Sequence, residues 1–338
     1  MKIIFRTNGG KNIGLGHVYR CTSLAQAMKE SKKDIEIVFV SNIETKEIIE
    51  ENQFEFISSN SFDQNDLFEI KKLKPDLIVF DSYLADNQYL RRLKNISRFV
   101  VFDDNNDIYD SSIPDLIING NLHALKLNYI NKEKHLLGPK YLVMKKEYWK
   151  NQFEKMDDSL NNHRKNSTPL MITTGGADFN KIMIKFIKVL KDLDIKKEVI
   201  IGPLYEDKYI EDIKNEISDN LSFELIYKPK SLKKYIENSD YVLTAAGSTV
   251  YEVLTLKKIP IIYTLAENQE LIAKELENYG IINLGNYNNL DYTRIKKIIA
   301  DVVLNKASLN RKVKYLFDIF DAQGAKRVAE KLIGEIYQ

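Results

Sequence analysis

The sequence predicts an α/β fold of two doubly wound, Rossmann-like domains. Short, nearly continuous apolar runs alternate with amphipathic segments, a pattern typical of parallel sheets covered by helices on both faces. The alternation breaks once, in a polar, Asn-rich stretch, and then resumes with the same architecture. We therefore predict an N-terminal domain over 1–150, a linker over 151–168 and a C-terminal domain over 169–338. We leave open that the last helix packs back on the N-terminal domain.

The expected elements follow from the apolar runs in chain order. For the first domain we expect strands at 2–6, 35–40, 54–57, 77–80, 99–102, 116–118 and 141–143, with helices including 18–28, 45–52, 63–72 and 87–94. For the second we expect strands at 170–173, 198–201, 223–226, 241–244, 259–263 and 281–283, with helices at 180–190, 205–217, 231–238, 249–256, 268–279, 291–303 and 322–337. Because ligands of doubly wound domains bind at the carboxyl ends of the strands, we expect the two domains to face each other across a cleft.

Composition narrows the class of protein. The 338 residues suit two domains, and 44% hydrophobic with 29% charged residues indicates a globular chain. A net charge of +2 gives no general case for nucleic acid or an anionic membrane. The single cysteine, Cys21, excludes a disulfide framework and suits a reducing cytosol. The chain begins directly with a strand, and no apolar run approaches the ~20 residues that span a bilayer. We expect a cytoplasmic monomer.

The first strand runs into a Gly-rich turn that ends in a histidine at the start of a helix. Gly14 and Gly16 flank the approach to His17 and leave its surroundings bare of side chains. Histidine is a suitable general acid/base near neutral pH. As a metal ligand His17 lacks neighbours, because the other histidines, at 123, 135 and 163, have no ligand spacing. A structural role at the helix start is the remaining alternative, and the two glycines favour chemistry over it.

Polar residues follow three further strands of the first domain, where a doubly wound domain keeps its site. They are Asp81, Tyr83, Asp103, Asp104, Asn119 and Asn121. Asp and Asn also end strands simply because turns favour them, so we expect about half of these to be turn formers only.

The second domain carries two Gly turns that follow strands. Gly175 and Gly176 precede a helix expected at Asn180, and their N–H groups could cradle a diphosphate or form an ordinary tight turn. A second turn, with Ala246, Gly247, Ser248 and Thr249, repeats the arrangement and leads to Glu252. Glu252 could accept both ribose hydroxyls or only complement the helix dipole. Asn268 and Gln269 could bind sugar hydroxyls or cap a helix. Together the turns and Glu252 favour a nucleotide site.

The motifs resemble a known family. The run Gly14-Leu15-Gly16-His17 is similar to the start of the pseudaminic-acid pathway hydrolase, which hydrolyses UDP-2,4-diacetamido-2,4,6-trideoxy-β-L-altropyranose. The similarity continues in order and spacing along nearly the whole chain, through Phe80-Asp81-Ser82-Tyr83, Phe102-Asp103-Asp104, Asn119-Gly120-Asn121, Thr174-Gly175-Gly176-Ala177-Asp178, Ala246-Gly247-Ser248-Thr249, Glu252, Pro260 and Asn268-Gln269. The wider set includes a spore-coat polysaccharide protein.

The resemblance implies a two-domain glycosyltransferase-B fold. It implies that UDP binds mainly to the second domain, with Gly175, Gly176, Gly247 and Ser248 at the diphosphate and Glu252 at the ribose. Ala246 and Thr249 would also belong to the nucleotide site. It implies that His17 is the catalytic acid/base, with no metal and no cofactor, and that Gly14, Gly16, Asp81, Tyr83, Asp104, Asn119, Asn121, Asn268 and Gln269 line the substrate. Water would replace UDP at the anomeric carbon.

Other functions stay open at this point. A glycosyltransferase on the same fold would use a sugar or lipid acceptor in place of water, and a hydrolysing UDP-sugar 2-epimerase is a third enzyme reading. A non-catalytic nucleotide-sugar-binding protein would have no need of His17 beside Gly16. The sugar stereochemistry and the choice among UDP, GDP and CMP donors also stay open.

Overall fold

The computed structural model describes residues 1–11, 13–149, 170–304 and 306–336. The chain divides into two compact units. Unit 1 comprises Met1–Lys150 and Ala322–Gln338, and unit 2 comprises Asn151–Asp321. The linker expected over 151–168 lies outside the described residues.

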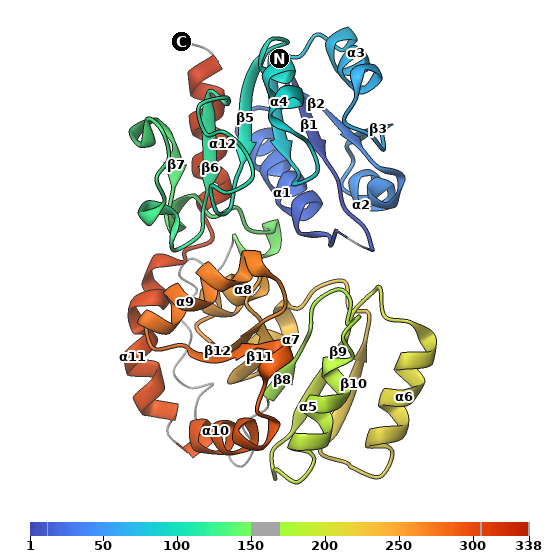
Figure 1. Cartoon of the computed structure of the whole chain (residues 1–338), viewed down its shortest axis with the longest axis vertical. Helices are drawn as coiled ribbons and strands as arrows, with labels where there is room; N and C mark the ends of the chain where they lie inside the picture. The colour runs from blue at the N-terminus through green and yellow to red at the C-terminus, as the bar shows by residue number, and fades with distance from the viewer. Residues whose placement is uncertain (12, 150–169, 305, 337–338) are drawn as a thin grey trace. The chain divides into compact units, whose positions relative to one another are not determined.

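Unit 1 is one parallel sheet with helices on both faces (Figure 1). In its described part, seven strands follow the order β3-β2-β1-β4-β5-β6-β7. The strands are β1 (Lys2–Thr7), β2 (Glu36–Ser41), β3 (Glu55–Ser58), β4 (Leu77–Asp81), β5 (Arg98–Phe102), β6 (Leu116–Asn119) and β7 (Leu136–Leu137), and the helices are α1 (Gly16–Ser31), α2 (Lys46–Glu51), α3 (Gln64–Lys72), α4 (Asn87–Lys94) and α12 (Gly324–Ile336).

Alternation along β1 explains the two layers of helices. Ile3 and Phe5 enter a core cluster with Leu24 of α1 and Val328 of α12. Ile4 enters the other cluster, which holds residues of α3 and α4. Because successive side chains of a strand point to opposite faces, a strand buried on both faces is apolar throughout.

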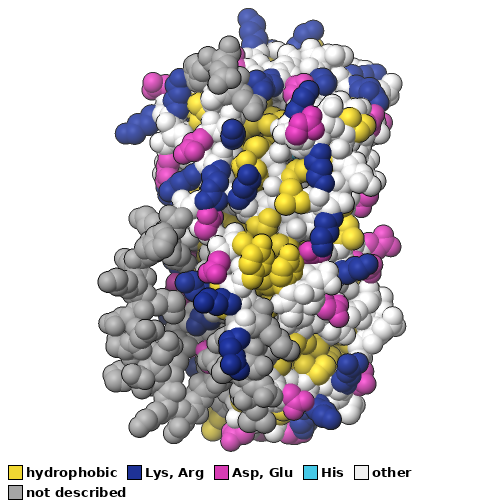
Figure 2. Space-filling model, turned by 90° about the vertical axis from the view of Figure 1, so that its left-hand side faces the viewer, with side chains coloured by type: hydrophobic (Ala, Val, Ile, Leu, Met, Phe, Trp, Pro, Cys, Tyr) yellow, Lys and Arg dark blue, Asp and Glu magenta, His cyan; other side chains and the backbone are white. Residues whose placement is uncertain are grey.

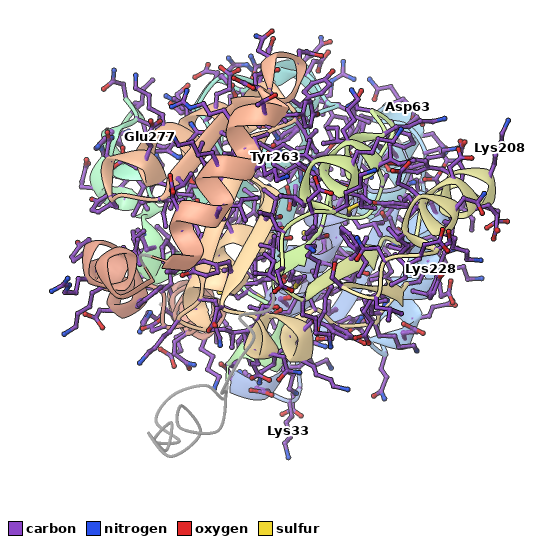
Figure 3. The ribbon with its side chains drawn as sticks, turned by 90° about the horizontal axis from the view of Figure 1, so that it is seen from below. Lys33, Asp63, Lys208, Lys228, Tyr263 and Glu277 are labelled. Carbon is purple, nitrogen blue, oxygen red and sulfur yellow. The ribbon has the colours of Figure 1, made fainter. Side chains whose placement is uncertain are left out.

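Unit 2 repeats the plan with a second parallel sheet. In its described part, six strands follow the order β10-β9-β8-β11-β12-β13. The strands are β8 (Leu170–Ile172), β9 (Lys197–Ile201), β10 (Phe223–Tyr227), β11 (Tyr241–Ala245), β12 (Ile259–Thr264) and β13 (Ile282–Asn286), and the helices are α5 (Ile182–Leu190), α6 (Asp207–Ile217), α7 (Lys233–Asn238), α8 (Thr249–Thr255), α9 (Glu270–Asn278), α10 (Tyr292–Leu304) and α11 (Lys306–Ile319). Within this unit Tyr263 of β12 lies in the interior, while Lys208, Lys228 and Glu277 lie at the periphery (Figure 3).

The C-terminal helix belongs to unit 1 and not to the unit that precedes it in sequence. Helix α12 packs against α1 and places Ala325, Val328, Ala329 and Leu332 in the core that holds Phe5. The side-chain amide of Gln323 donates to the carbonyl of Trp149 at 2.6 Å, and Arg327 donates to the carbonyl of Lys140 at 3.0 Å.

One expected strand is absent from the structure, and one helix of the structure was not expected. The strand expected at 141–143 is wrong: the last strand of the sheet is Leu136–Leu137, and Gly138, with φ +90°, leads into a 3₁₀ turn over Pro139–Tyr141. Proline lacks the N–H that a strand ladder needs, so the ladder ends before it. Helix α11 was not expected at all.

Charged side chains of both signs are mixed on the described surface that Figure 2 shows. On the face drawn in Figure 2, basic and acidic side chains are interspersed around a group of hydrophobic ones, so the described side chains there form no patch of a single sign. None of the described helices combines the length and apolar character needed to cross a membrane.

Candidate active site

The loop between β1 and α1 is fixed by its own backbone. Gly10 and Gly14 form an antiparallel bridge, with N–O distances of 2.9 and 2.8 Å, and both have φ in the left-handed region that favours glycine (+136° and +85°). The side chain of Asn42, just after β2, binds Gly9 through both its carbonyl and its amide. Side chains added at Gly14 or Gly16 would meet nothing within 4 Å, so the approach to the start of α1 is open at both positions.

His17 is held by a buried carboxylate. Its Nδ1 lies 2.6 Å from Oδ1 of Asp81, which ends β4, the strand next to β1. The His17 side chain is 8% exposed and that of Asp81 is fully buried. A carboxylate only accepts hydrogen bonds, so Nδ1 carries the proton and Nε2 of the neutral ring carries the lone pair. The Tyr83 ring meets the imidazole edge-on, with centroids 4.6 Å apart.

Arg20 joins Asp81 to a second carboxylate. Its Nε and Nη2 donate to the two oxygens of Asp81 at 2.5 and 2.7 Å. Its Nη1 donates to both oxygens of Asp104 at 2.9 and 3.0 Å. The guanidinium carbon lies 4.9 Å from the centre of the Phe102 ring, a cation–π contact. The site therefore holds two carboxylates bridged by one fixed cation.

The charges keep both carboxylates ionised. Burial alone would raise the pKa of Asp81, but the Arg20 charge, together with the hydrogen bonds from Arg20 and His17, outweighs it and lowers that pKa. Burial opposes ionisation of Asp104 in the same way, and Arg20 and the Tyr83 hydroxyl still hold its pKa far below the usual range. Burial, reinforced by Asp81, raises the pKa of Cys21, so this neighbouring thiol stays protonated.

The side chains of Asp104, Asn119 and Asn121 bind other protein groups, and their contact with substrate stays a prediction. Besides Arg20, Asp104 accepts from the Tyr83 hydroxyl and from Nδ2 of Asn121 at 2.8 Å. The Asn119 amide donates to the Asp104 carbonyl at 2.9 Å and accepts from the backbone N–H of Asn121 at 3.0 Å. Asn119 is 1% exposed and Asn121 is 6% exposed. Because their groups already have internal partners, they hold the strand ends together.

Two residues of this region escaped the sequence analysis. Arg20 follows His17 by three positions, and residues three apart on a helix share a face, so the spacing could have indicated it. Asn8, directly after β1, is 4% exposed, and neither its amide nitrogen nor its oxygen has a hydrogen-bond partner among the described residues. No sequence pattern signals such an unpaired buried amide.

Neighbouring residues of unit 2 fix the conformation of the Gly175-Gly176 turn. Gly175 has φ +91°, and side chains added at either glycine would meet nothing within 4 Å. The turn is fixed by Thr174, whose hydroxyl lies 2.5 Å from that of Tyr205, and by the close approach of Gly202. A side chain at Gly202 would lie 2.4 Å from the Gly175 carbonyl oxygen.

The turn does not run directly into a helix, which corrects one expectation. Helix α5 begins at Ile182 and not at Asn180, after Lys181 in the left-handed region at φ +49°. The Asp178 carboxylate accepts from the N–H groups of Ile182 and Met183 at 2.9 and 2.7 Å. The positive end of α5 is therefore neutralised within the protein and is not available to a phosphate.

The second turn lies close to one of the remaining expected residues, Gln269. Ser248 is exposed and Thr249 half-buried at the start of α8, and Glu252 is 6% exposed one turn later. Ala246 is fixed by its N–H to the Tyr263 carbonyl at 2.8 Å. A side chain at Gly247 would lie 3.8 Å from Nε2 of Gln269. Gln269 in turn accepts from the Leu265 N–H at 2.9 Å, while Asn268 is exposed.

Metal ligation finds no support in the arrangement of side chains. Within the residues that the structure describes, no group of three or more His, Cys, Asp or Glu side chains could hold a metal ion. The chemistry that the geometry can perform is proton transfer at Nε2 of His17, with Asp81 orienting the ring.

The two parallel sheets define a glycosyltransferase-B type of fold, as predicted. Acinetobacter baumannii MurG has a TM-score of 0.71 at 12% identity, and the comparison covers 99% of this chain and 100% of that one. The UDP-GlcNAc 2-epimerase from Neisseria meningitidis, bound to UDP-GlcNAc, has a TM-score of 0.63 at 11% identity over 99% and 100% of the two chains. At such identities these structures share the fold alone.

Sequence comparison gives nearer relatives. The chain is 29% identical over 274 residues to the uncharacterized protein MJ1062 of Methanocaldococcus jannaschii, covering 78% of this chain and 55% of that protein, so it spans about half of that relative. It is 23% identical over 281 residues to the spore coat polysaccharide biosynthesis protein SpsG of Bacillus subtilis, covering 81% and 80%. It is 22% identical over 287 residues to the UDP-2,4-diacetamido-2,4,6-trideoxy-beta-L-altropyranose hydrolase of Campylobacter jejuni, covering 83% and 97%. No family model matches the chain. The predicted resemblance to the hydrolase and the spore-coat protein is confirmed.

Proposed function

We propose that this chain hydrolyses a UDP-linked 2,4-diacetamido-trideoxy sugar to UDP and the free sugar, in the biosynthesis of a nonulosonic acid of the pseudaminic type. The observation that carries the proposal is the His17–Asp81 pair, at 2.6 Å, beside the two open glycine positions Gly14 and Gly16. The similarity to the Campylobacter jejuni hydrolase supports the same reaction.

In the proposed reaction His17 activates water. Nε2 takes a proton from water as the water oxygen bonds to the anomeric carbon, and the bond from that carbon to the diphosphate oxygen breaks, with its electron pair leaving on UDP. Asp81 holds the ring in the productive tautomer and stabilises the imidazolium that forms. UDP is already a good leaving group, so the remaining tasks are positioning and charge stabilisation. The step uses no metal and no cofactor.

For unit 2 we propose nucleotide binding. The two Gly turns would bind the diphosphate, with Gly175, Gly176, Gly247, Ser248 and Thr249 beside it. Ala246, whose N–H already binds the Tyr263 carbonyl, would hold the second turn in place. Glu252 would accept the ribose hydroxyls, and Asn268 and Gln269 would bind polar groups of the substrate. With the anion site at α5 already filled by Asp178, the diphosphate contacts in this proposal are those of the turns themselves.

The test is a panel of nucleotide sugars, with UDP, GDP and CMP donors, incubated without acceptor and followed by NMR. We expect UDP and free sugar from a UDP-diacetamido sugar only. A His17→Asn variant should lose about 10²- to 10⁴-fold in rate while keeping its circular dichroism spectrum, because an acid/base group contributes on that order. The matched control is His135→Asn, since that ring binds the Ile117 N–H away from the site and should leave the rate within about twofold.

The outcomes separate the alternatives. Release of no UDP from any donor would reject hydrolysis and favour a transferase or a binding protein. A product epimerised at carbon 2 would favour a 2-epimerase. Normal turnover by folded His17→Asn would remove His17 from the mechanism.

A further inference from the structure

The Arg20 side chain binds two carboxylates in a fixed geometry, in addition to balancing their charge. Its fork of two N–H groups binds both oxygens of Asp81, and the third nitrogen binds Asp104. The guanidinium is planar and rigid, so these contacts fix the plane of the Asp81 carboxylate. The Asp81 oxygen nearest His17 is shared between Nδ1 of the ring and Nη2 of Arg20.

A single ammonium could not replace this fork. A lysine at position 20 could not donate simultaneously in the fixed fork geometry to carboxylates on β4 and after β5. The contact also spans two strands: Asp81 ends β4 and Asp104 follows β5, its paired neighbour. Arg20 therefore holds the carboxyl ends of adjacent strands in register beneath His17.

We propose that Arg20 is a positioning residue that orients Asp81 toward Nδ1 of His17 and sets the pH range in which Nε2 acts as a base. This inference rests on the proposed function, because it gives Arg20 a role through His17. The proposed action of Arg20 is on the Nδ1 side of the ring, where its Nη2 lies 3.3 Å from Nδ1.

The direction of the effect follows from the charges that face the ring. From β4 and the segments after β4 and β5 these are Asp81 and Asp104, both ionised, and Tyr83, whose phenol is held neutral by burial and by Asp104. From α1 they are Arg20 and the protonated Cys21. Removing the arginine leaves two carboxylates uncompensated, which favours the imidazolium and moves its titration to higher pH. Removing the negative charge of Asp104 has the opposite effect and disfavours the imidazolium.

The test uses Arg20→Met, Asp104→Asn and the matched control Arg91→Met, whose arginine makes an exposed ion pair with Asp110. Titration of the histidine side chains by NMR, with His17 assigned from the His17→Asn variant, gives the tautomer and the midpoint without any substrate. We expect the wild-type neutral ring to carry its proton on Nδ1. The midpoint should rise in Arg20→Met, fall in Asp104→Asn and stay unchanged in the control.

Kinetics add a second measurement on an active substrate. The acidic limb of the kcat/KM profile should move with the NMR midpoint, and kcat of Arg20→Lys should fall about 10- to 100-fold with little change in KM, as expected for a misplaced catalytic group. A folded Arg20→Met protein with the wild-type tautomer and midpoint would overturn the inference. If no nucleotide sugar is hydrolysed, the proposed function fails, while the NMR result still decides whether Arg20 controls His17. If Arg20→Met does not fold, the Asp104→Asn variant decides alone. The absence of a midpoint shift in that variant would overturn the inference.

Discussion

At the scale of single residues, Asp81 makes hydrogen bonds with more groups of the candidate site than His17 does. It is fully buried, and it accepts from His17, from Arg20 and, at 3.6 Å, from the Cys21 thiol. Its backbone carbonyl accepts from the Thr7 hydroxyl at 3.0 Å, across the β1–β4 pairing. A carboxylate without these donors could not stay ionised in such a place. The chemistry at His17 therefore depends on the strand pair beneath it.

Glu252 gives a residue-scale test of the nucleotide proposal. We expect Glu252→Ala to weaken UDP binding by about 10-fold or more in calorimetry, because a carboxylate that accepts two ribose hydroxyls contributes charge-assisted hydrogen bonds. The rate at saturating substrate should change much less. The matched control is Glu270→Ala, at an exposed position in the same unit, which should leave UDP affinity unchanged. Unchanged affinity in Glu252→Ala would reject the ribose assignment.

The sequence pointed to both members of the His17–Asp81 pair, whose role in the reaction stays a prediction. His17 follows a strand and two glycines, and Asp81 ends a strand, so position alone suggested both. Asn119 has the same signature, yet the fold uses its amide internally. A polar residue at a strand end can contact a ligand or a neighbouring strand. The choice depends on contacts between residues far apart in sequence. The amide of Asn8, which has no partner in the part of the chain that the structure describes, is likewise visible only in three dimensions.

At the scale of elements, the chain returns to unit 1 at α12. This return depends on close contact between the start of α12 and the backbone at Leu142. A Cβ added at Gly324, the first residue of α12, would lie 2.1 Å from the Leu142 carbonyl oxygen. A Cβ at Gly120 would lie 2.3 Å from the Leu142 Cα. Two glycines from distant parts of the chain thus bracket one backbone segment.

Paired glycine substitutions in α12 test this contact. Gly324→Ala should lower the free energy of unfolding of unit 1 by about 2 kcal/mol or more, since the clash is with backbone that must shift. Gly334→Ala, exposed in the same helix with nothing near its Cβ, should raise stability by about 0.5–1 kcal/mol. Urea unfolding followed by Trp149 fluorescence measures both, because this single tryptophan lies in the unit 1 core. Equal effects of the two substitutions would contradict the packing argument.

Most elements were predictable because buried parallel strands are nearly all apolar. The strand at 141–143 was mispredicted because an apolar run does not reveal where hydrogen-bonded pairing stops, and the preceding Gly138-Pro139 turn was given too little weight. Val313 and Leu316 of α11 and Phe320, just after it, are all buried and have helical spacing, a signal that predicts a helix here. The start of α5 could not be found from apolar spacing, because the Asp178 cap fixes it.

At the scale of the whole molecule, the two units have separate cores and separate buried charges. Trp149 reports on unit 1, so unfolding of unit 2 needs a second signal, such as far-UV circular dichroism. A two-state treatment of the whole chain is not justified in advance. Unit 2 carries its own titrating group in Lys197, the first residue of β9, which is fully buried.

Lys197 predicts how the stability of unit 2 depends on pH. Its ammonium donates to the Leu193 carbonyl at 2.6 Å and to the Ser222 hydroxyl at 2.7 Å, and no carboxylate of the described residues forms an ion pair with it. Burial lowers the pKa of Lys197 to about 8, from 10.5. Between these two values the unfolded chain binds more protons than the folded one, so stability rises with pH across that window.

The measurement is urea unfolding of wild type and Lys197→Met at a series of pH values from 7 to 10.5, with circular dichroism and Trp149 fluorescence read together. The wild-type free energy of unfolding, relative to Lys197→Met, should increase by about 3 kcal/mol in total as pH rises through the window. Subtracting the variant removes the opposing effect of tyrosines and Cys21, which titrate in both proteins. Lys191→Met, at an exposed position, should show no such trend. A pH-independent difference between wild type and Lys197→Met would show that the buried amine keeps its ordinary pKa, and the cost of burying its charge would then have to be met by the two hydrogen bonds alone.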